Sequence, residues 1–487
     1  MSARPSTIDH RTAAAQLADS VPRQSRVWRR LAGLWLVPDS AENLAIFRIV
    51  IALLLLGSGD LALAPQVAAL PPTLRIVPDG AAWLALLPLA VPAVKFGAAL
   101  VYAAALFALV GIYARPALAV ATLAALYTLG VAQLGGAVFH CHHLLWCSAL
   151  LCASPCSDAL SVDAWRTARR YPGQAPAPAV SYGLPLRIAW ALFGVVFFFP
   201  GLWKLRTSGW AWIVSDNLQN QMYLKWLQLG GYVPSLRIDK VPLLCHAIAA
   251  LVVLLELSFP LLVFLSALRK LAVLFALLFH LGAWLYMGID YSNLWPCYVI
   301  FFDWTAVLGW LRTRLLGPRK PLAYRLPSHA LFPTLLLGCG LLFGSIFQGA
   351  RGRMNAWPFA CYPTFARLAP ASLPLLLVDV SGPDGNPRVL PRPSELGRHS
   401  GPRAWALNWS ALGIAAGASA GAPDPRRMQA YWDYLRTLPE LAPTLTSVCT
   451  VRFYRATMAL NPEASRTSPA QRKLLYTLSL PCTSRGS

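Results

Sequence analysis

The chain has 487 residues, of which 56% are hydrophobic and 13% charged, and its mean hydropathy is +0.51. This composition excludes an ordinary soluble protein. It predicts a polytopic membrane protein with helical spans, because every backbone amide in hydrocarbon must be paired within its own segment. The net charge of +22 does not indicate nucleic-acid binding, because the basic residues flank the apolar runs, as topology-setting charges do.

Nine apolar runs have roughly the length of one helical crossing, about 20 residues. They lie at 44–64, 94–112, 116–136, 139–154, 184–203, 242–266, 270–288, 294–311 and 328–348. The fourth run is short and the eighth is interrupted, so these two spans are the least clearly defined. We therefore predict an all-α transmembrane domain at 44–348 after a cytoplasmic segment at 1–43.

Three basic groups predict the orientation. They are Arg23, Arg26, Arg29 and Arg30; Arg166, Arg169 and Arg170; and Arg312, Arg314, Arg319, Lys320 and Arg325. Because cytoplasmic loops are enriched in lysine and arginine, we expect the N-terminus inside and, with nine spans, the C-terminal segment outside. The expected location is a bacterial inner membrane.

A dense group of histidines and cysteines lies in the fourth run. Its members are His140, Cys141, His142, His143, Cys147, Cys152 and Cys156. Such ligands can hold zinc, copper or haem. The spacing is not CxxC, however, and His143 with Cys147 simply share one helix face. Helix packing is therefore the favoured role, and we predict no bound metal.

The fifth run ends in Lys204, one of only seven lysines in the chain. An arginine at this boundary would be a plain anchor, whereas a lysine can lose its proton when burial disfavours its charged form. Lys204 is therefore a candidate catalytic base. We predict that Trp203, Trp210 and Trp212, which surround it in the sequence, contact a bound cofactor. The alternative is an aromatic belt at the membrane surface. The apolar spacing in the 204–241 loop also predicts an interfacial amphipathic helix.

Ionisable side chains inside spans are costly and often functional. Glu256 lies in the middle of the sixth span, where the alternatives are an ion pair with an arginine such as Arg48 and a direct functional role. His280 in the seventh span is either a hydrogen-bonded packing residue or part of a site. Asp303 in the eighth span is expected to bond to nearby indoles or backbone.

Residues 349–487 contain no further span and predict a small extracytoplasmic α+β domain. A strand at 373–380 runs into a turn with the sequence GPDGNP, a helical pattern covers 426–438, and a second strand covers 447–458. One disulfide is compatible with the cysteines of this segment, Cys361, Cys449 and Cys482, although their pairing cannot be deduced.

Five segments, in order along the chain, resemble the horizontally transferred transmembrane (HTTM) domain, the membrane part of vitamin K-dependent γ-carboxylases. They are ENLAIFRIVIALLLL (42–56), HHLLWCSALLCASPCSDALSVDAWR (142–166), FFFPGLWKLRTSGW (197–210), LELSFPLLVF (255–264) and FH with the aromatic span after it (279–302). The second is similar to the family's NHYYL…SLDAW segment, and the third to its YFxAGLxKLxxxW segment. The resemblance implies the same nine-span topology.

The resemblance also implies that Lys204 is the catalytic base. In the carboxylases a neutral lysine deprotonates vitamin K hydroquinone, and the oxygenated quinone then takes the γ-proton of a substrate glutamate, which captures carbon dioxide. The products are γ-carboxyglutamate and vitamin K epoxide. By position, His143 and His280 would line the active site or donate hydrogen bonds to a developing oxyanion. Arg48 and Glu256 would support helix packing.

The implied cofactor is reduced vitamin K, a menaquinol-type hydroquinone that enters through the bilayer, and the implied substrate is a peptide or protein at the outer face. The chain departs from the family pattern in three places: His142 replaces an Asn-like residue, Pro200 precedes the Gly-Leu pair, and the large lumenal recognition region of the animal enzymes is missing. Pro200 could kink the helix that carries Lys204. The alternative function is a non-catalytic membrane protein that supports export or maturation of a partner through the extracytoplasmic domain.

Overall fold

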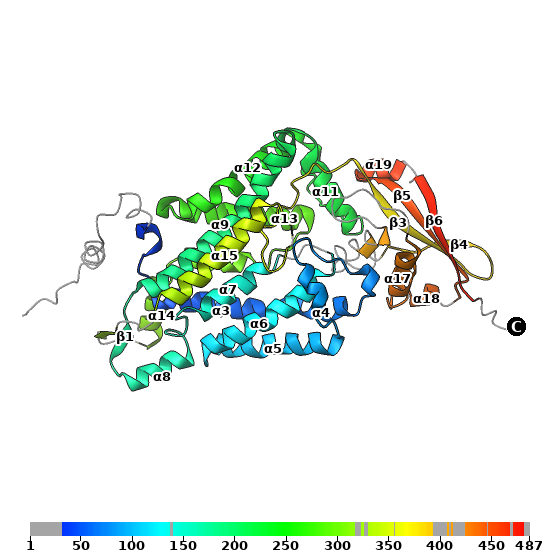
Figure 1. Ribbon diagram of the computed structural model, residues 1–487. Helices are drawn as coiled ribbons and strands as arrows, with labels where there is room; N and C mark the ends of the chain where they lie inside the picture. Colours follow the sequence, from blue (N-terminus) through cyan, green and yellow to red (C-terminus); the bar gives the residue numbers. More distant parts are fainter. Residues whose placement is uncertain are drawn as a thin grey trace, which may run out of the picture.

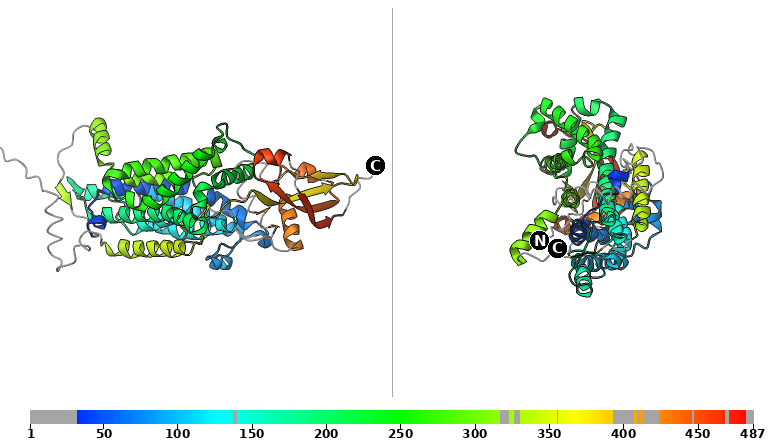
Figure 2. Two further views of the ribbon diagram at one scale, coloured as in Figure 1. Left: turned by 90° about the horizontal axis from the view of Figure 1, so that it is seen from above. Right: turned by 90° about the vertical axis from the view of Figure 1, so that its left-hand side faces the viewer.

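The computed structural model describes residues 32–136, 140–316, 323–325, 330–354, 356–392, 407–408, 411–412, 424–445, 447–467 and 471–481. A bundle of long helices forms one part of the molecule, and a small sheet with short helices forms the other (Figure 1). The two parts lie end to end, as the view from above shows (Figure 2).

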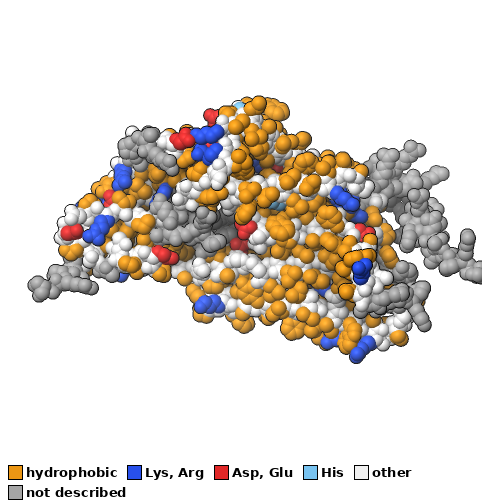
Figure 3. All heavy atoms as spheres, turned by 180° about the vertical axis from the view of Figure 1, so that it is seen from behind, with side chains coloured by type: hydrophobic (Ala, Val, Ile, Leu, Met, Phe, Trp, Pro, Cys, Tyr) orange, Lys and Arg blue, Asp and Glu red, His pale blue; other side chains and the backbone are white. Residues whose placement is uncertain are grey.

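Seven stretches of the described chain are helical, long and apolar enough to cross a membrane, which indicates an integral membrane protein. They are Ala41–Ala68 (α3 Ala41–Leu56 followed by α4 Gly59–Ala68), α5 Val91–Val110, α6 Ala114–Gln133, α9 Val180–Ser208, α12 Pro242–Leu262, α13 Ser266–Met287 and α15 Phe332–Ala350. Hydrophobic side chains cover much of the helical part of the face in Figure 3, and charged side chains gather mainly towards its ends.

The two least clearly predicted spans are not helices of membrane length. The fourth range contains α7, His142–Cys152, which has 11 residues and is followed by Pro155, a residue that cannot continue a helix. The eighth range contains a 3-10 helix, η4 Trp295–Phe301, and then α14 Thr305–Leu316, which begins beyond Asp303. The prediction of one apolar helix at each range is corrected accordingly.

Short elements connect the long helices. They are η1 Pro72–Leu74, η2 Ala82–Leu86, α8 Val162–Arg170, β1 Gln174–Pro176, α10 Ala211–Val214, α11 Asn217–Gln228, η3 Ile238–Lys240 and β2 Ala323–Arg325. The helix expected in the 204–241 loop is confirmed as α11. Asp303 accepts hydrogen bonds from the Asn43 amide and from the Thr305 backbone and hydroxyl, so it has the structural role expected for it.

One end of the bundle collects the basic elements. An isolated bridge between Asp39 and Ala179 places the starts of α3 and α9 together, and β1 pairs with β2, which brings α8 beside the chain that follows α14. The arginines of α8 and α14 therefore lie at the end opposite the sheet (Figure 1). Arg23, Arg26, Arg29, Arg30, Arg319 and Lys320 lie outside the described residues.

Helices α9 and α12 pack closely at two glycines of α9. A Cβ atom added to Gly201 would lie 2.9 Å from the Cβ of Glu256, and one at Gly194 would lie 2.9 Å from the Cβ of Pro260. Without side chains at these two positions the helix backbones can approach. Helix α9 runs unbroken from Val180 to Ser208, with Pro200 inside it. This packing places Lys204 of α9 against Glu256 of α12.

The second part of the molecule is an antiparallel sheet with the strand order β4-β3-β5-β6. Its strands and helices are β3 Ser372–Ser381, β4 Pro387–Val389, α17 Pro425–Leu435, α18 Ala442–Leu445, β5 Thr450–Ala459, α19 Pro462–Thr467 and β6 Gln471–Ser479. The predicted hairpin, helix and second strand are confirmed, whereas β6 was not predicted.

One hydrophobic core extends from the bundle into the sheet, since Trp146 of α7, Trp357, Phe453 of β5 and Trp432 of α17 belong to the same buried cluster.

Among the cysteines of the C-terminal segment, Cys449 is disulfide-bonded, Cys361 is free and buried, and Cys482 lies outside the described residues.

Candidate functional site

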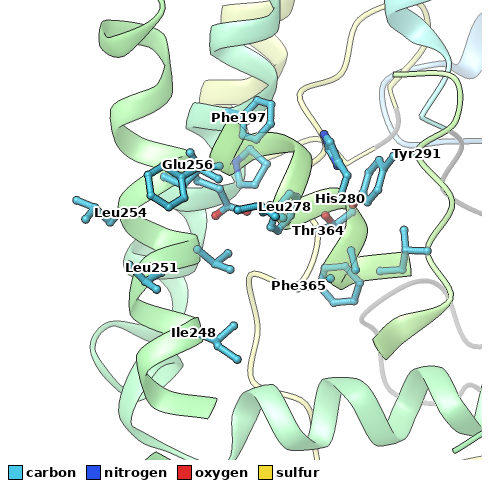
Figure 4. A pocket seen from close by; sticks show the side chains of 18 of the residues that line it. Phe197, Ile248, Leu251, Leu254, Glu256, Leu278, His280, Tyr291, Thr364 and Phe365 are labelled. Atoms are coloured by element: carbon cyan, nitrogen blue, oxygen red, sulfur yellow. The ribbon is translucent and has the colours of Figure 1, made fainter. Parts of the chain in front are cut away.

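A cavity of about 730 Å³ lies between α9, α11, α12, α13 and the chain after α15. Most of its walls are aliphatic or aromatic. The ionisable or polar side chains that reach it include His140, His143, Lys204, Gln221, Glu256, Ser258, His280, Tyr286, Tyr291, Tyr362 and Thr364. Glu256, His280 and Phe365 surround the same space, although they come from distant parts of the chain (Figure 4). A largely apolar cavity with a few converging polar groups is the usual form of a small-molecule site.

Lys204 and Glu256 form a buried ion pair on the cavity wall. The Lys204 Nζ donates to Glu256 Oε1 at 2.5 Å and to Oε2 at 2.7 Å, and the two residues are 3% and 4% exposed. Nζ also lies 5.1 Å from the centroid of the Trp212 ring, a cation–π contact. An ammonium that bonds to both carboxylate oxygens fits the charged form of the pair.

This pairing corrects the ion pair that the sequence suggested between Glu256 and Arg48. Arg48 instead donates to the backbone carbonyl oxygens of Cys156 and Leu160 at 2.8 and 2.5 Å. It thereby ties α3 to the chain after α7. Glu256 is the residue against which Lys204 is held, so its role extends beyond helix packing.

His280 presents a ring nitrogen to which no described residue hydrogen-bonds. Its Nε2 lies 2.6 Å from the hydroxyl of Tyr298, and its ring lies 4.5 Å from the ring of Tyr291, measured between centroids. Its Nδ1 is buried and has no hydrogen-bond partner among the described residues. A buried polar atom without a partner is costly, so Nδ1 is the atom of His280 that a bound molecule would satisfy.

His143 is arranged differently, although it lines the same cavity. Its Nε2 lies 2.6 Å from the backbone carbonyl oxygen of Asn293, which can only accept, so this nitrogen carries the proton. In the neutral ring Nδ1 is then an acceptor. Both histidines were expected to donate to an oxyanion. Within the described residues, His280 has a buried ring nitrogen without a partner that could do so, whereas His143 holds the chain before η4 through Asn293.

Only one of the three predicted cofactor-binding tryptophans reaches the cavity. Trp212 is buried and lines it. Trp203 points away from Lys204, its neighbour on α9, and its indole donates to the Gly349 carbonyl oxygen of α15 at 2.7 Å. Trp210 is 75% exposed after the end of α9. Consecutive helical residues point about 100° apart, so proximity in sequence misplaced Trp203.

A segment after α15, residues 356–369, closes the end of the cavity nearest the sheet; we call it the strap. Tyr362, Thr364 and Phe365 of the strap line the cavity. Indoles from two helices donate to its backbone, Trp146 to Pro358 O at 2.9 Å and Trp212 to Phe365 O at 2.7 Å. Because Trp212 also stacks near Lys204, the strap and the ion pair are held by the same side chain.

His142 anchors the strap rather than the cavity. Its Nδ1 lies 2.5 Å from the Tyr362 hydroxyl and its Nε2 lies 3.1 Å from the Ala356 carbonyl oxygen. Behind the strap, the Nζ of Lys225 lies 5.5 Å from the Phe365 ring, and burial lowers the pKa of this lysine to about 8. Lys225 therefore loses its proton at a lower pH than a lysine in water does.

The cavity reaches the apolar exterior of the bundle between α12 and α13. Several of its lining residues are also among the exposed large hydrophobic side chains of these helices: Leu251, Leu254, Leu268, Leu271, Phe275 and Leu278. Both helices are of membrane length. An amphiphile could therefore place a polar head beside Lys204 and leave its tail between the two helices.

Most of the residues that line the cavity were not predicted as part of a site. Tyr291 and Tyr362 carry no sequence signal beyond their aromatic surroundings. His140 stood in the histidine–cysteine group, whose density was the available signal, but that group does not converge. Within the described residues, no group of three or more His, Cys, Asp or Glu side chains could hold a metal ion.

A comparison with known proteins finds no matching family model, no matching curated protein and no matching solved structure. The function proposed below therefore rests on the geometry of the cavity and on the sequence resemblance.

Proposed function

We propose that the chain is a membrane enzyme of the HTTM type, which oxidises a lipid hydroquinone and couples this oxidation to carboxylation of glutamate in a peptide or protein. The observation that supports it best is the buried Lys204–Glu256 pair in an apolar cavity that opens between two membrane-length helices. If Lys204 only anchored its helix at the membrane surface, a cavity beside it would not be expected.

The residues present fit a reduced vitamin K-type hydroquinone. The aromatic and aliphatic walls suit its ring and tail, and its hydroxyl groups have two kinds of partner, the Lys204–Glu256 pair and the unpartnered Nδ1 of His280. Such a hydroquinone supplies the reducing equivalents and, with oxygen, the strong base that glutamate carboxylation requires.

Glu256 gives Lys204 a route to the neutral amine that a base must be. Transfer of one proton from Nζ to the carboxylate converts the ion pair into an amine and a carboxylic acid without moving net charge into the cavity. The amine can then accept a proton from a hydroxyl group held by His280. The isolated neutral lysine implied by the resemblance is thus replaced by a proton-sharing pair.

The proposed topology has the basic end of α8 and α14 in the cytoplasm of a bacterial cell and the sheet outside its inner membrane. Substrate glutamate would then approach from the side of the strap.

The first test is epoxide formation from vitamin K hydroquinone in membranes supplied with bicarbonate, oxygen and a glutamate-rich peptide. Wild type is expected to form epoxide, and Lys204→Ala to lose it. Lys270→Ala, which removes an exposed lysine of α13, is the matched control and is expected to retain activity. Equal activity in Lys204→Ala and wild type would reject Lys204 as the base.

A second candidate function, non-catalytic support of a partner's export or maturation, is favoured by strand β6. It forms one edge of the sheet and carries exposed Arg472 and Lys473. An exposed edge can add an extended strand from another chain. This function predicts that Lys204→Ala is tolerated, whereas deletion of the sheet from residue 372 onward, which leaves the strap intact, abolishes function.

A further inference from the structure

Two arginines stack on one buried tryptophan at the basic end of the bundle. The guanidinium carbon of Arg187 in α9 lies 3.8 Å from the ring centroid of Trp190, and that of Arg269 in α13 lies 4.2 Å from the same centroid. The indole is 3% exposed and donates to the Ile300 carbonyl oxygen at 2.9 Å. The ring therefore has a fixed position, and both guanidinium groups lie against it.

Among the described residues, these two arginines have few hydrogen-bond partners. Arg187 Nε is buried and has no partner among the described residues. Arg269 Nε donates to the Val263 carbonyl oxygen at 2.7 Å. Neither residue forms an ion pair with a carboxylate in the described part of the chain. Asp39 attracts both through space, but its Oδ1 accepts from Ser40 N and the Asn43 amide.

Other aromatic rings lie near Trp190. Phe264 lies 5.8 Å from Trp190, and Trp35 lies 5.7 Å from Phe264, measured between ring centroids. Arg269 is in the first turn of α13, where the helix dipole adds partial positive charge. Lys270, the next residue, is a further exposed cation. The cluster thus combines two guanidinium groups that have no carboxylate partner at salt-bridge distance among the described residues, several aromatic rings and an excess of positive charge.

We propose that Arg187 and Arg269 bind the phosphate group of an anionic phospholipid from the leaflet at the basic end. The planar guanidinium fork matches the oxygens of a phosphate, and charge-assisted bonds of this kind are the strong ones. Basic pockets between transmembrane helices are typical sites for such headgroups. The site is separate from the Lys204 cavity and does not depend on the proposed enzymatic function.

Lipid-dependent thermal unfolding of the purified full chain in detergent tests this proposal. Phosphatidylglycerol is expected to raise the unfolding midpoint of wild type, because a ligand that binds only the folded state stabilises it. Phosphatidylcholine and inorganic phosphate are expected to do so weakly or not at all. In Arg187→Gln/Arg269→Gln the apparent affinity for phosphatidylglycerol is expected to fall at least about tenfold, the effect of losing one or more charge-assisted bonds.

Arg314→Gln is the matched control, because Arg314 also lies near a tryptophan of the same end, 5.9 Å from the Trp310 ring, but is exposed on α14. Its response to phosphatidylglycerol should equal that of wild type. If the double variant does not fold, the single Arg269→Gln variant and the lipids retained by each protein in native mass spectrometry provide the same comparison. Equal responses in all variants, no response in wild type, or equal stabilisation by inorganic phosphate would each overturn the lipid site.

Discussion

At the scale of single residues, Glu256 has as much influence on the site as Lys204. Each is the counter-charge of the other, at 2.5 and 2.7 Å and almost without solvent. A buried ion pair contributes little net stability compared with an apolar pair, but loss of one partner leaves the other charge uncompensated. Stability and chemistry can therefore be separated by substitutions at these two positions.

Glu256→Gln is expected to lower the free energy of unfolding by about 3–5 kcal/mol, because it leaves the ammonium of Lys204 buried without a counter-charge. The double variant Lys204→Met/Glu256→Leu removes both charges and should recover most of this loss while remaining inactive. Denaturant unfolding in detergent measures both. Leu254→Ala, on the exposed side of α12, is the control and should change stability little. A Glu256→Gln protein as stable as wild type would contradict the buried pair.

Two amide substitutions at His280 test the roles of its two ring nitrogens one at a time. Asparagine places its amide near the position of Nδ1, and glutamine reaches the position of Nε2. If Nδ1 bonds to the ligand, His280→Gln should reduce epoxide formation by about 10²–10³-fold, the usual cost of one oxyanion donor. His280→Asn should retain more activity. If His280→Gln instead retained more epoxide formation than His280→Asn, the hydrogen bond to Tyr298 would matter and Nδ1 would not. His246→Gln, outside the cavity, is the control.

At the scale of elements, the approach of α9 to α12 at Gly201 determines whether Lys204 and Glu256 meet. Gly201→Ala puts a Cβ 2.9 Å from that of Glu256, so the helices must separate, which should cost about 1–3 kcal/mol of stability, as for other overpacked sites. Gly282→Ala on α13 is the matched control, because a Cβ there meets nothing within 4 Å. It should be neutral or slightly stabilising. Equal unfolding midpoints for the two variants would show that the close approach is not needed.

The strap, at the other side of the cavity, also helps to position Lys204. It belongs to the membrane part of the molecule by its contacts, although by sequence it begins the C-terminal segment. Trp212 joins the two, since its indole donates to the strap and its ring faces Lys204. A change in the strap is therefore expected to reach the ion pair through this tryptophan.

At the scale of the whole molecule, the proposed orientation can be tested by labelling single cysteines with a membrane-impermeant thiol reagent in bacterial cells. Arg388→Cys, exposed on β4, should be labelled in cells whose outer membrane alone is permeable. Arg314→Cys, exposed on α14, should be labelled only after the inner membrane is opened. The wild-type chain gives the background from its own cysteines. The opposite pattern would reverse the proposed topology.

How far the sequence predicts the site differs from residue to residue. Lys204, Glu256 and His280 stand out because an ionisable side chain in an apolar run is rare and costly. The partner of Glu256 could not be predicted, since Arg48 and Lys204 are both basic residues at span boundaries or within spans. Trp203 is the neighbour of Lys204 in sequence and Trp212 is eight residues away, yet it is Trp212 that the turn of the chain after Ser208 brings back to the cavity.

The amino-acid sequence by itself determined that the chain forms membrane-length helices followed by a small α+β part. It could do so because helical hydrogen bonding and the apolar length of a span are local properties. Only the tertiary structure decided which side chains meet: the Lys204–Glu256 pair, the strap across the cavity and the two arginines on Trp190. Apart from the Arg187–Trp190 contact within α9, these contacts join residues tens to hundreds of positions apart. They depend on helix rotation and on close approaches such as that at Gly201, which no local pattern encodes.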